Sequence, residues 1–396
     1  MCIYEHADTY INTAYYWLML YIKLLKGRII YMKTGKAAIL TAVDTPFEIR
    51  EYPLTPPEPG MALLKMEASG ICGTDIHIYH GKIPMELPRM IGHEFIGEII
   101  DISPEDAKKY GLAVGDSAIV DIACPCGECP LCQDGDDANC VHMGVTNGGN
   151  PEEAPHFFGG YGQYSYAPIK NLIKLPKELD ARMACVYACA GPTVIHAFEL
   201  AKKANCHLEK AKVAVVQGLG PVGTFAVLYL AKLGIKHIIA LTAGHNAQRE
   251  ELALKLGASE VLNLEKLSQE QILGRIKELN GGLGCDLVFE ASGSINALPA
   301  GMEMLRNRGV YLVPGQYSNS GKAEISPQLI TFNALHIIGS SQYSISDVET
   351  YLAFLKTNPD THALIASLAT CYKLEDINKA FEDAMAGKNI KTMLAE

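Results

Sequence analysis

The stretch Lys212-Val-Ala-Val-Val-Gln217-Gly-Leu-Gly-Pro-Val-Gly223 decides the fold of this chain of 396 residues. It begins with a β-branched run typical of a buried strand, and the glycines that follow lead into a segment with a helical pattern. The first glycine permits a tight turn, the second lets backbone approach a pyrophosphate, and the third lets the helix pack on the strand. This context favours a dinucleotide site over an ordinary glycine-rich turn. The expected contacts are Gly218, Gly220, Pro221, Val222 and Gly223.

The pattern of apolar residues, glycines and prolines differs on the two sides of Pro192. From Met32 to about Leu179, short apolar runs are broken by Gly and Pro, which predicts a compact, barrel-like β domain. After Pro192, strands alternate with helices, which predicts a parallel sheet. Strands are expected at 212–217, 238–241, 287–290, 309–313 and 336–339, and the helix after the glycine turn should run to about Leu233.

Composition and charge favour a globular α/β enzyme with a small-molecule substrate. Of the residues, 48% are hydrophobic and 20% are charged, and 36 are glycine. The 34 basic and 44 acidic side chains give a net charge of −10, which argues against nucleic acid as a partner. No apolar run reaches the roughly 20 residues that a membrane helix needs, so no membrane partner is expected.

Residues 1–31 differ from the rest of the chain because they are rich in tyrosine and contain its only tryptophan, Trp17. We expect an N-terminal appendage that is not part of the fold. Glu5 and Asp8 stand where a signal peptide carries cations, and no clear cleavage site follows. A reducing cytoplasm is therefore the expected location.

The cysteines cluster as metal ligands do. Five of the 12 cysteines fall between Cys124 and Cys140, and the others are scattered along the chain. Disulfide frameworks are typical of small secreted domains, so this clustering favours metal binding. Four thiolates in a short loop can close a tetrahedron around a structural zinc ion. The alternatives are an iron–sulfur centre and cysteines that serve as small buried apolar residues. Cys124 is not expected to be a ligand. The expected ligands are Cys126, Cys129, Cys132 and Cys140.

Two further polar clusters resemble two edges of one metal pocket: Gly70-Ile-Cys72-Gly-Thr-Asp-Ile-His77 and Gly92-His-Glu-Phe-Ile-Gly97. Cys72 and His93 are ligand types that zinc accepts, and a catalytic zinc needs a third protein ligand and an open position. A cysteine or a histidine taken alone is more often structural.

These four motifs occur in the order found in zinc-dependent medium-chain alcohol dehydrogenases, which the chain resembles from Met32 to Glu396. The resemblance implies an α/β fold in which a GroES-like β-barrel catalytic domain is interrupted by an inserted Rossmann domain with a doubly wound parallel sheet. We expect the catalytic domain at residues 32–190 and 342–396, and the Rossmann domain at residues 191–341.

The resemblance also implies roles for single residues. Cys189, in a segment similar to the family's Cys-Ala-Gly, is expected to be the third ligand of the catalytic zinc, in preference to Cys185. Thr74 and His77 are expected to pass the alcohol proton to solvent. Asp75 would fix the ring of His93, and Glu94 lies behind the metal in the family.

The choice between NAD and NADP stays open. An NAD site usually has an acid about 20 residues after the glycines, and residues 241–249 contain none. His245 and Arg249 could instead bind the 2′-phosphate of NADP. Among the family's coenzyme contacts, the matching positions are Thr193, Gly315 and the phosphate contact Lys391. Gly73 departs from the family, because some members have a basic residue there for the pyrophosphate.

The sequence thus predicts an oxidoreductase that transfers hydride between an alcohol, or its aldehyde or ketone, and a nicotinamide coenzyme, with two zinc ions per chain. A homodimer or homotetramer is expected. A polyol or threonine-type dehydrogenase of the same family is the first alternative, and a non-catalytic zinc- and nucleotide-binding relative is the second. Residues 143–160 border the expected substrate cleft but have no pattern that assigns a substrate.

Overall fold

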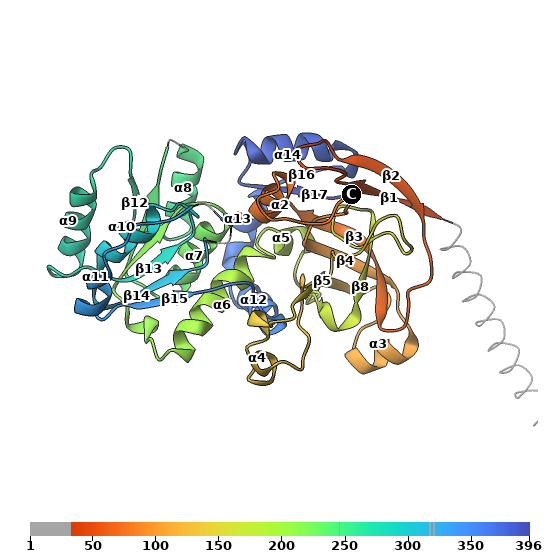
Figure 1. Ribbon diagram of the computed structural model, residues 1–396, viewed down its shortest axis with the longest axis horizontal. Helices are drawn as coiled ribbons and strands as arrows, with labels where there is room; N and C mark the ends of the chain where they lie inside the picture. The colour runs from red at the N-terminus through yellow and green to blue at the C-terminus, as the bar shows by residue number, and fades with distance from the viewer. Residues whose placement is uncertain (1–32, 245, 317, 320) are drawn as a thin grey trace, which may run out of the picture.

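The computed structural model describes residues 33–244, 246–316, 318–319 and 321–396. The predictions for the appendage 1–31 and for His245 lie outside the described residues. The described chain forms two sheets that lie side by side, with the helices packed around and between them (Figure 1).

One side of the molecule is built on a largely antiparallel sheet of seven strands in the order β16-β17-β3-β4-β5-β9, with β8 on β3. Two small two-stranded sheets, β1-β2 and β6-β7, accompany it. The bounds are β1 (Thr34–Ile39), β2 (Glu48–Pro53), β3 (Met61–Gly70), β4 (Glu94–Asp101), β5 (Ser117–Val120), β6 (Ala123–Cys124), β7 (Gly144–Val145), β8 (Tyr164–Pro168), β9 (Leu172–Lys174), β16 (Ala369–Tyr372) and β17 (Lys391–Leu394).

The other side is built on a parallel sheet of six strands in the order β12-β11-β10-β13-β14-β15. This is the strand order of a doubly wound dinucleotide-binding fold, in which ligands bind where the order reverses, between β10 and β13. The bounds are β10 (Val213–Gln217), β11 (His237–Thr242), β12 (Glu260–Asn263), β13 (Cys285–Glu290), β14 (Leu305–Val313) and β15 (His336–Gly339).

Helices cover both faces of the parallel sheet, and the central strand β10 is buried on both faces along its whole length. Ala214 and Val216 of β10 pack in one core with α6, α7 and α12, while Val213 and Val215 pack in another with α9 and α10. The helix bounds are α2 (Gly73–Tyr79), α3 (Pro104–Tyr110), α4 (Pro130–Gln133), α5 (Ala181–Cys185), α6 (Ala190–Lys203), α7 (Pro221–Lys232), α8 (Ala247–Lys255), α9 (Gln269–Leu279), α10 (Ala297–Met304), α11 (Pro327–Phe332), α12 (Ile345–Thr357), α13 (His362–Ala366) and α14 (Ile377–Met385).

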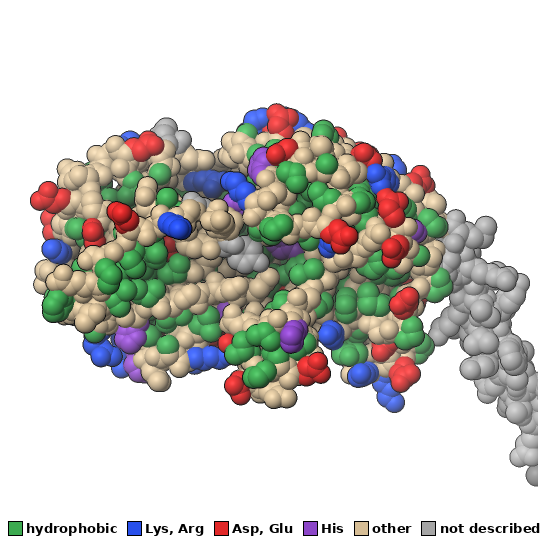
Figure 2. Space-filling model, in the orientation of Figure 1, with side chains coloured by type: hydrophobic (Ala, Val, Ile, Leu, Met, Phe, Trp, Pro, Cys, Tyr) green, Lys and Arg blue, Asp and Glu red, His purple; other side chains and the backbone are tan. Residues whose placement is uncertain are grey.

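The expected α/β fold class is confirmed, and the chain returns after β15 to finish the first sheet, because β17 pairs with β3. The strand expected at 336–339 is β15, while β12 was not expected from the sequence. Among the described helices, none has both the length and the apolar character needed to cross a bilayer. On the face shown in Figure 2, basic and acidic side chains are interspersed rather than gathered by sign.

Candidate active site

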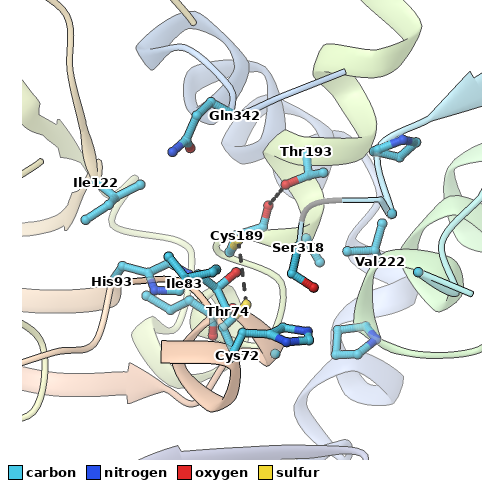
Figure 3. A pocket seen from close by; sticks show the side chains of 18 of the residues that line it. Cys72, Thr74, Ile83, His93, Ile122, Cys189, Thr193, Val222, Ser318 and Gln342 are labelled. Carbon is cyan, nitrogen blue, oxygen red and sulfur yellow. Dashed lines mark hydrogen bonds between the residues drawn. The ribbon is translucent and has the colours of Figure 1, made fainter. Parts of the chain in front are cut away.

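A cavity of about 420 Å³ lies where the two sheets meet, and both sides of the molecule line it (Figure 3). The seven-stranded side contributes residues of α2 and of the loops around β4, β5 and β7. The parallel sheet contributes the loops that follow β10, β13, β14 and β15. Since ligands of such sheets bind at the carboxyl ends of the strands, the cavity lies where a dinucleotide would meet a substrate.

Cys72, His93, Glu94 and Cys189 converge on this cavity from three separate segments. Cys72 is the N-cap of α2, His93 directly precedes β4, and Cys189 is the N-cap of α6. One ligand atom from each of the four lies within 4.8 Å of the others, and the two sulfurs are 4.0 Å apart.

This donor set fits a zinc ion. A tetrahedron with Zn–S bonds of about 2.3 Å has edges of about 3.8 Å, close to the observed sulfur separation. Asp75 steadies two ligands at once: its Oδ1 lies 3.2 Å from His93 Nδ1, and its Oδ2 accepts the backbone N–H of Cys72 at 2.9 Å. With Nδ1 held by this buried carboxylate, His93 Nε2 is left for the metal.

The electrostatics of this cluster favour a thiolate at Cys72. A hydrogen bond with the Cys189 thiol and then the charge of His93 hold the pKa of Cys72 well below its usual value, against the effect of burial. Burial alone would lower the pKa of His93, but the charges of Asp75 and Cys72 raise it well above its usual value. Zinc binds the thiolate and not the thiol, so the lowered pKa of Cys72 favours binding of the metal cation.

Cys185 does not join the cluster, although it lies only one helical turn before Cys189. Its side chain is fully buried, and its thiol donates to the backbone oxygen of Glu94 at 3.2 Å. Burial raises the pKa of Cys185 well above its usual value. A neutral thiol with a backbone partner behaves as a small buried side chain, so the geometry favours Cys189 as the ligand.

Glu94 and Lys391 form a buried ion pair behind the sulfur cluster. Burial raises the pKa of Glu94 to about 7, and Lys391 opposes that rise. The Lys391 ammonium also donates to the backbone oxygen of Ile71 at 3.4 Å. Only 2% of Lys391 is exposed, and it does not line the cavity, so its contact with a coenzyme phosphate stays a prediction.

The second cysteine cluster lies in the lobe around α4, which projects at the lower edge of Figure 1. The sulfurs of Cys126, Cys129, Cys132 and Cys140 all lie within 4.8 Å of one another, with measured separations of 3.4 to 4.0 Å. Backbone N–H groups of Cys126 and His142 each donate to Cys140 Sγ at 3.3 Å. Four sulfurs at tetrahedral spacing fit a zinc ion and leave no position for substrate.

The glycine turn has the shape that the sequence predicted. Gly218 has a φ of +95°, which favours glycine, and a side chain at Gly223 would strike the Gly218 carbonyl oxygen at 1.9 Å. A side chain at Gly220 would meet nothing within 4 Å. That open space lies at the N-terminus of α7, where phosphate groups are favoured.

The other expected coenzyme residues are placed as follows. Thr193, Pro221, Val222 and Gly315 line the cavity, and the Thr193 hydroxyl donates to the Cys189 carbonyl oxygen at 2.8 Å. Arg249 lies outside the cavity lining but reaches the glycine turn, where its guanidinium donates to the Leu219 carbonyl oxygen at 3.2 Å.

Thr74 and His77 both line the cavity on one face of α2, three residues apart. His77 Nδ1 is buried and has no hydrogen-bond partner among the described residues. Burial, followed by the positive charge of Lys82, lowers the pKa of His77. A neutral imidazole with a free ring nitrogen can accept a proton.

Sequence reasoning missed the apolar wall of the cavity, formed by Ile78, Ile83, Met85, Ile122 and Val145. These apolar residues come from separate helices, loops and strands, and single apolar residues carry no recognisable signal. It also missed the turn Ala291-Ser292-Gly293, which the position after β13 could have indicated.

The segment 143–160 borders the cavity over only part of its length. Val145 and Asn147 line the cavity. Further along, Glu152 pairs with Arg50, and His156 stacks on Tyr52 with ring centroids 4.7 Å apart. These contacts hold residues 150–156 against β2 rather than against the cavity.

Comparison with known proteins gives consistent results. Residues 58–177 match the model of the alcohol dehydrogenase GroES-like domain, and residues 221–357 match that of the zinc-binding dehydrogenases. The chain is 28% identical to 5-exo-hydroxycamphor dehydrogenase of Pseudomonas putida, over 92% of this chain and 99% of that relative. Sorbitol dehydrogenase of Halalkalibacterium halodurans is 27% identical, over 88% and 95%. An alcohol dehydrogenase structure from Thermotoga maritima superposes with a TM-score of 0.84 at 26% identity, over 92% and 99%.

Proposed function

The chain belongs to the zinc-dependent medium-chain alcohol dehydrogenases, and we propose that its reaction takes place in the cavity that Cys72, His93 and Cys189 line. It is an oxidoreductase that uses zinc and a nicotinamide coenzyme and transfers hydride between an alcohol and that coenzyme. One observation supports this location: the three ligand side chains converge in the same cavity that the glycine turn lines.

Different residues around the cavity are assigned to metal binding, proton transfer and positioning. When bound by Cys72, His93 and Cys189, zinc supplies a Lewis acid that lowers the pKa of a substrate hydroxyl. The Thr74 hydroxyl would accept the substrate's hydroxyl proton while releasing its own, and His77, one turn further along α2, would pass that proton to solvent. Asp75 acts as a positioning residue, because it holds both Cys72 and His93. Gly220, Thr193 and Val222 line the cavity and would hold the coenzyme, which would accept or supply the hydride when bound.

We propose two zinc ions per chain, the second held by Cys126, Cys129, Cys132 and Cys140. We also propose residues 32–190 with 342–396 as the catalytic domain and residues 191–341 as the coenzyme domain. The division is supported by the two sheets, since β10 to β15 all belong to one and β16 and β17 return to the other.

A homodimer or homotetramer is proposed as the assembly. Strand β15 ends the parallel sheet and pairs only with β14 in the described chain, so one of its edges is open to another strand. Phe332 beside it is 71% exposed. A reducing cytoplasm is the proposed compartment, which the free state of every described cysteine supports.

The function is tested by offering the zinc-loaded protein primary, secondary and poly-alcohols with NAD and with NADP, and by following coenzyme reduction. We expect reduction with at least one alcohol, and loss of it when zinc is removed by a chelator. Faster oxidation of polyols or of L-threonine would support the alternative within the family. Coenzyme binding without turnover of any alcohol would support the non-catalytic relative.

For the coenzyme, we propose that NADP is used at least as well as NAD. Arg249 follows the segment where an acid is missing and reaches the glycine turn at the Leu219 carbonyl oxygen, and its Nε is buried without a partner among the described residues. Arg249→Ala should raise the KM for NADP by about tenfold or more and change that for NAD much less, because charge-assisted bonds to phosphate are strong. The exposed neighbour Gln248 supplies the control, Gln248→Ala. A wild-type preference for NAD of about a hundredfold in kcat/KM would contradict the proposal.

A further inference from the structure

The cavity has two unlike halves. The loops after β10, β13 and β14 line the half that receives the coenzyme. The opposite half has an apolar wall formed by Ile78, Ile83, Met85, Ile122 and Val145, which come from α2, the loop after it, and the segments around β6 and β7. Asn147 and, from the loop after β15, Gln342 add polar side chains to the lining. Figure 3 shows Ile83 and Ile122 on one side of the Cys72 and Cys189 sulfurs and Val222 on the other. The substrate therefore meets an apolar wall while its reacting carbon faces the coenzyme.

The described lining offers little to a charged substrate. It contains no lysine or arginine, and its only carboxylate is Glu94, which is already paired with Lys391. Both partners of that pair are at most 2% exposed. The Asn147 side chain is also buried, and its amide donates to the Gly92 carbonyl oxygen at 3.4 Å. Apart from the zinc site, the described lining therefore offers no free counter-charge to a carboxylate or an ammonium group of a substrate.

Burial of polar groups decides between substrate classes. A hydroxyl or a charged group that leaves water without a new partner loses free energy, whereas apolar surface gains it. Polyol hydroxyls that lie against the isoleucine wall would find no new partner there, and the charges of an amino acid would find no free counter-charge among the described lining side chains. A hydrocarbon ring would instead cover the wall and displace its water.

Resting on the proposed function, we propose that the substrate is an uncharged alcohol with a compact, ring-sized apolar body, such as a cyclic or aryl alcohol, and neither a polyol nor a hydroxy amino acid. Ile83 is a specificity-determining residue for that body. Its backbone N–H donates to the His77 carbonyl oxygen at 3.3 Å, so the loop that carries Ile83 is tied to the proton-carrying helix. The Ile83 side chain is partly buried against the core and lines the cavity, so it would contact a substrate bound there.

The first test compares benzyl alcohol and cyclohexanol with D-sorbitol, L-threonine and ethanol, using the zinc-loaded full chain and each coenzyme. We expect kcat/KM for the two ring alcohols to exceed that for sorbitol and threonine by about a hundredfold or more, and to exceed that for ethanol as well. Equal or faster oxidation of sorbitol or threonine would overturn the proposed substrate class, while the proposed function would stand. If the protein holds zinc but reduces neither coenzyme with any of these alcohols, the proposed function itself fails.

The second test uses Ile83→Ala. Shortening this side chain should lower the ratio of kcat/KM for benzyl alcohol to that for ethanol by about tenfold, because ethanol does not reach the wall. The matched control is Ile49→Ala, since Ile49 lies on β2 outside the cavity and is 38% exposed. An unchanged ratio in Ile83→Ala would remove Ile83 from the substrate site. A ratio lowered equally in both variants would show a general effect and contradict the assignment.

Discussion

Replacing Cys189 with alanine is expected to lower the zinc content from two ions to one per chain and to abolish alcohol turnover. The Cys189 sulfur lies 4.0 Å from that of Cys72 and in the same cluster as His93. Removal of one of three protein ligands leaves a two-ligand site, and catalytic zinc sites normally have three. The remaining ion should stay in the lobe around α4, whose four cysteines are unchanged.

Cys185→Ala is the matched control for this prediction. Cys185 lies four residues earlier, but its thiol contacts the Glu94 carbonyl oxygen rather than the cluster. We expect both zinc ions and most of the activity to remain in this variant. Zinc per chain is measured by elemental analysis after exhaustive dialysis, and the thermal unfolding midpoint shows whether each variant is folded. Equal loss of zinc in the two variants would contradict the ligand assignment.

Thr74→Ala is expected to lower kcat by about a hundredfold to ten-thousandfold, the usual contribution of a general acid–base group. The Thr74 side chain lines the cavity within two residues of Cys72, so its hydroxyl would touch the substrate oxygen directly. A water molecule could not take that place without displacing substrate. Zinc content and coenzyme affinity should be unchanged, which separates the loss of proton transfer from damage to the site.

His77→Gln should cost about a hundredfold at most, because water can replace an imidazole at the solvent end of a proton path. Burial and then Lys82 hold the pKa of His77 below its usual value, so the ring is neutral at neutral pH. The wild-type rate of alcohol oxidation should fall as the pH drops through that lowered pKa, because the protonated ring cannot accept another proton. This limb of the pH profile should be absent in His77→Gln. An identical profile in the two proteins would exclude His77 from the proton path.

Local motifs made the fold predictable. The glycine turn combines residues that act within a few positions of one another, and the structure shows why two of its glycines are needed: Gly218 has a positive φ and Gly223 has no room for a side chain. The parallel strands were recognisable because burial on both faces leaves nearly continuous apolar runs. Strand β12 (Glu260–Asn263) escaped notice because it lies at the edge of the sheet, where three of its four residues are only half-buried.

The candidate site was predictable where ligands share a short segment, and otherwise only by resemblance to a family. Cys126, Cys129, Cys132 and Cys140 lie close in sequence, so their joint role follows from their spacing. Cys72, His93 and Cys189 come from segments far apart, and nothing in their spacing indicates that they meet. Asp75 is recognisable beside Cys72, but its contact with His93 depends on how α2 packs beside β4.

The sequence by itself therefore determined the fold class, the nucleotide turn and the cysteine lobe, because the steric and chemical demands of each are met within a short stretch of chain. Only the tertiary structure decided which cysteine faces Cys72, how the Arg249 side chain reaches the glycine turn, and what lines the substrate half of the cavity. Those features depend on the directions of side chains from distant segments after packing. Cys185 and Cys189 show the reason most directly: they are four residues apart, yet one thiol faces a backbone carbonyl and the other faces the sulfur of Cys72.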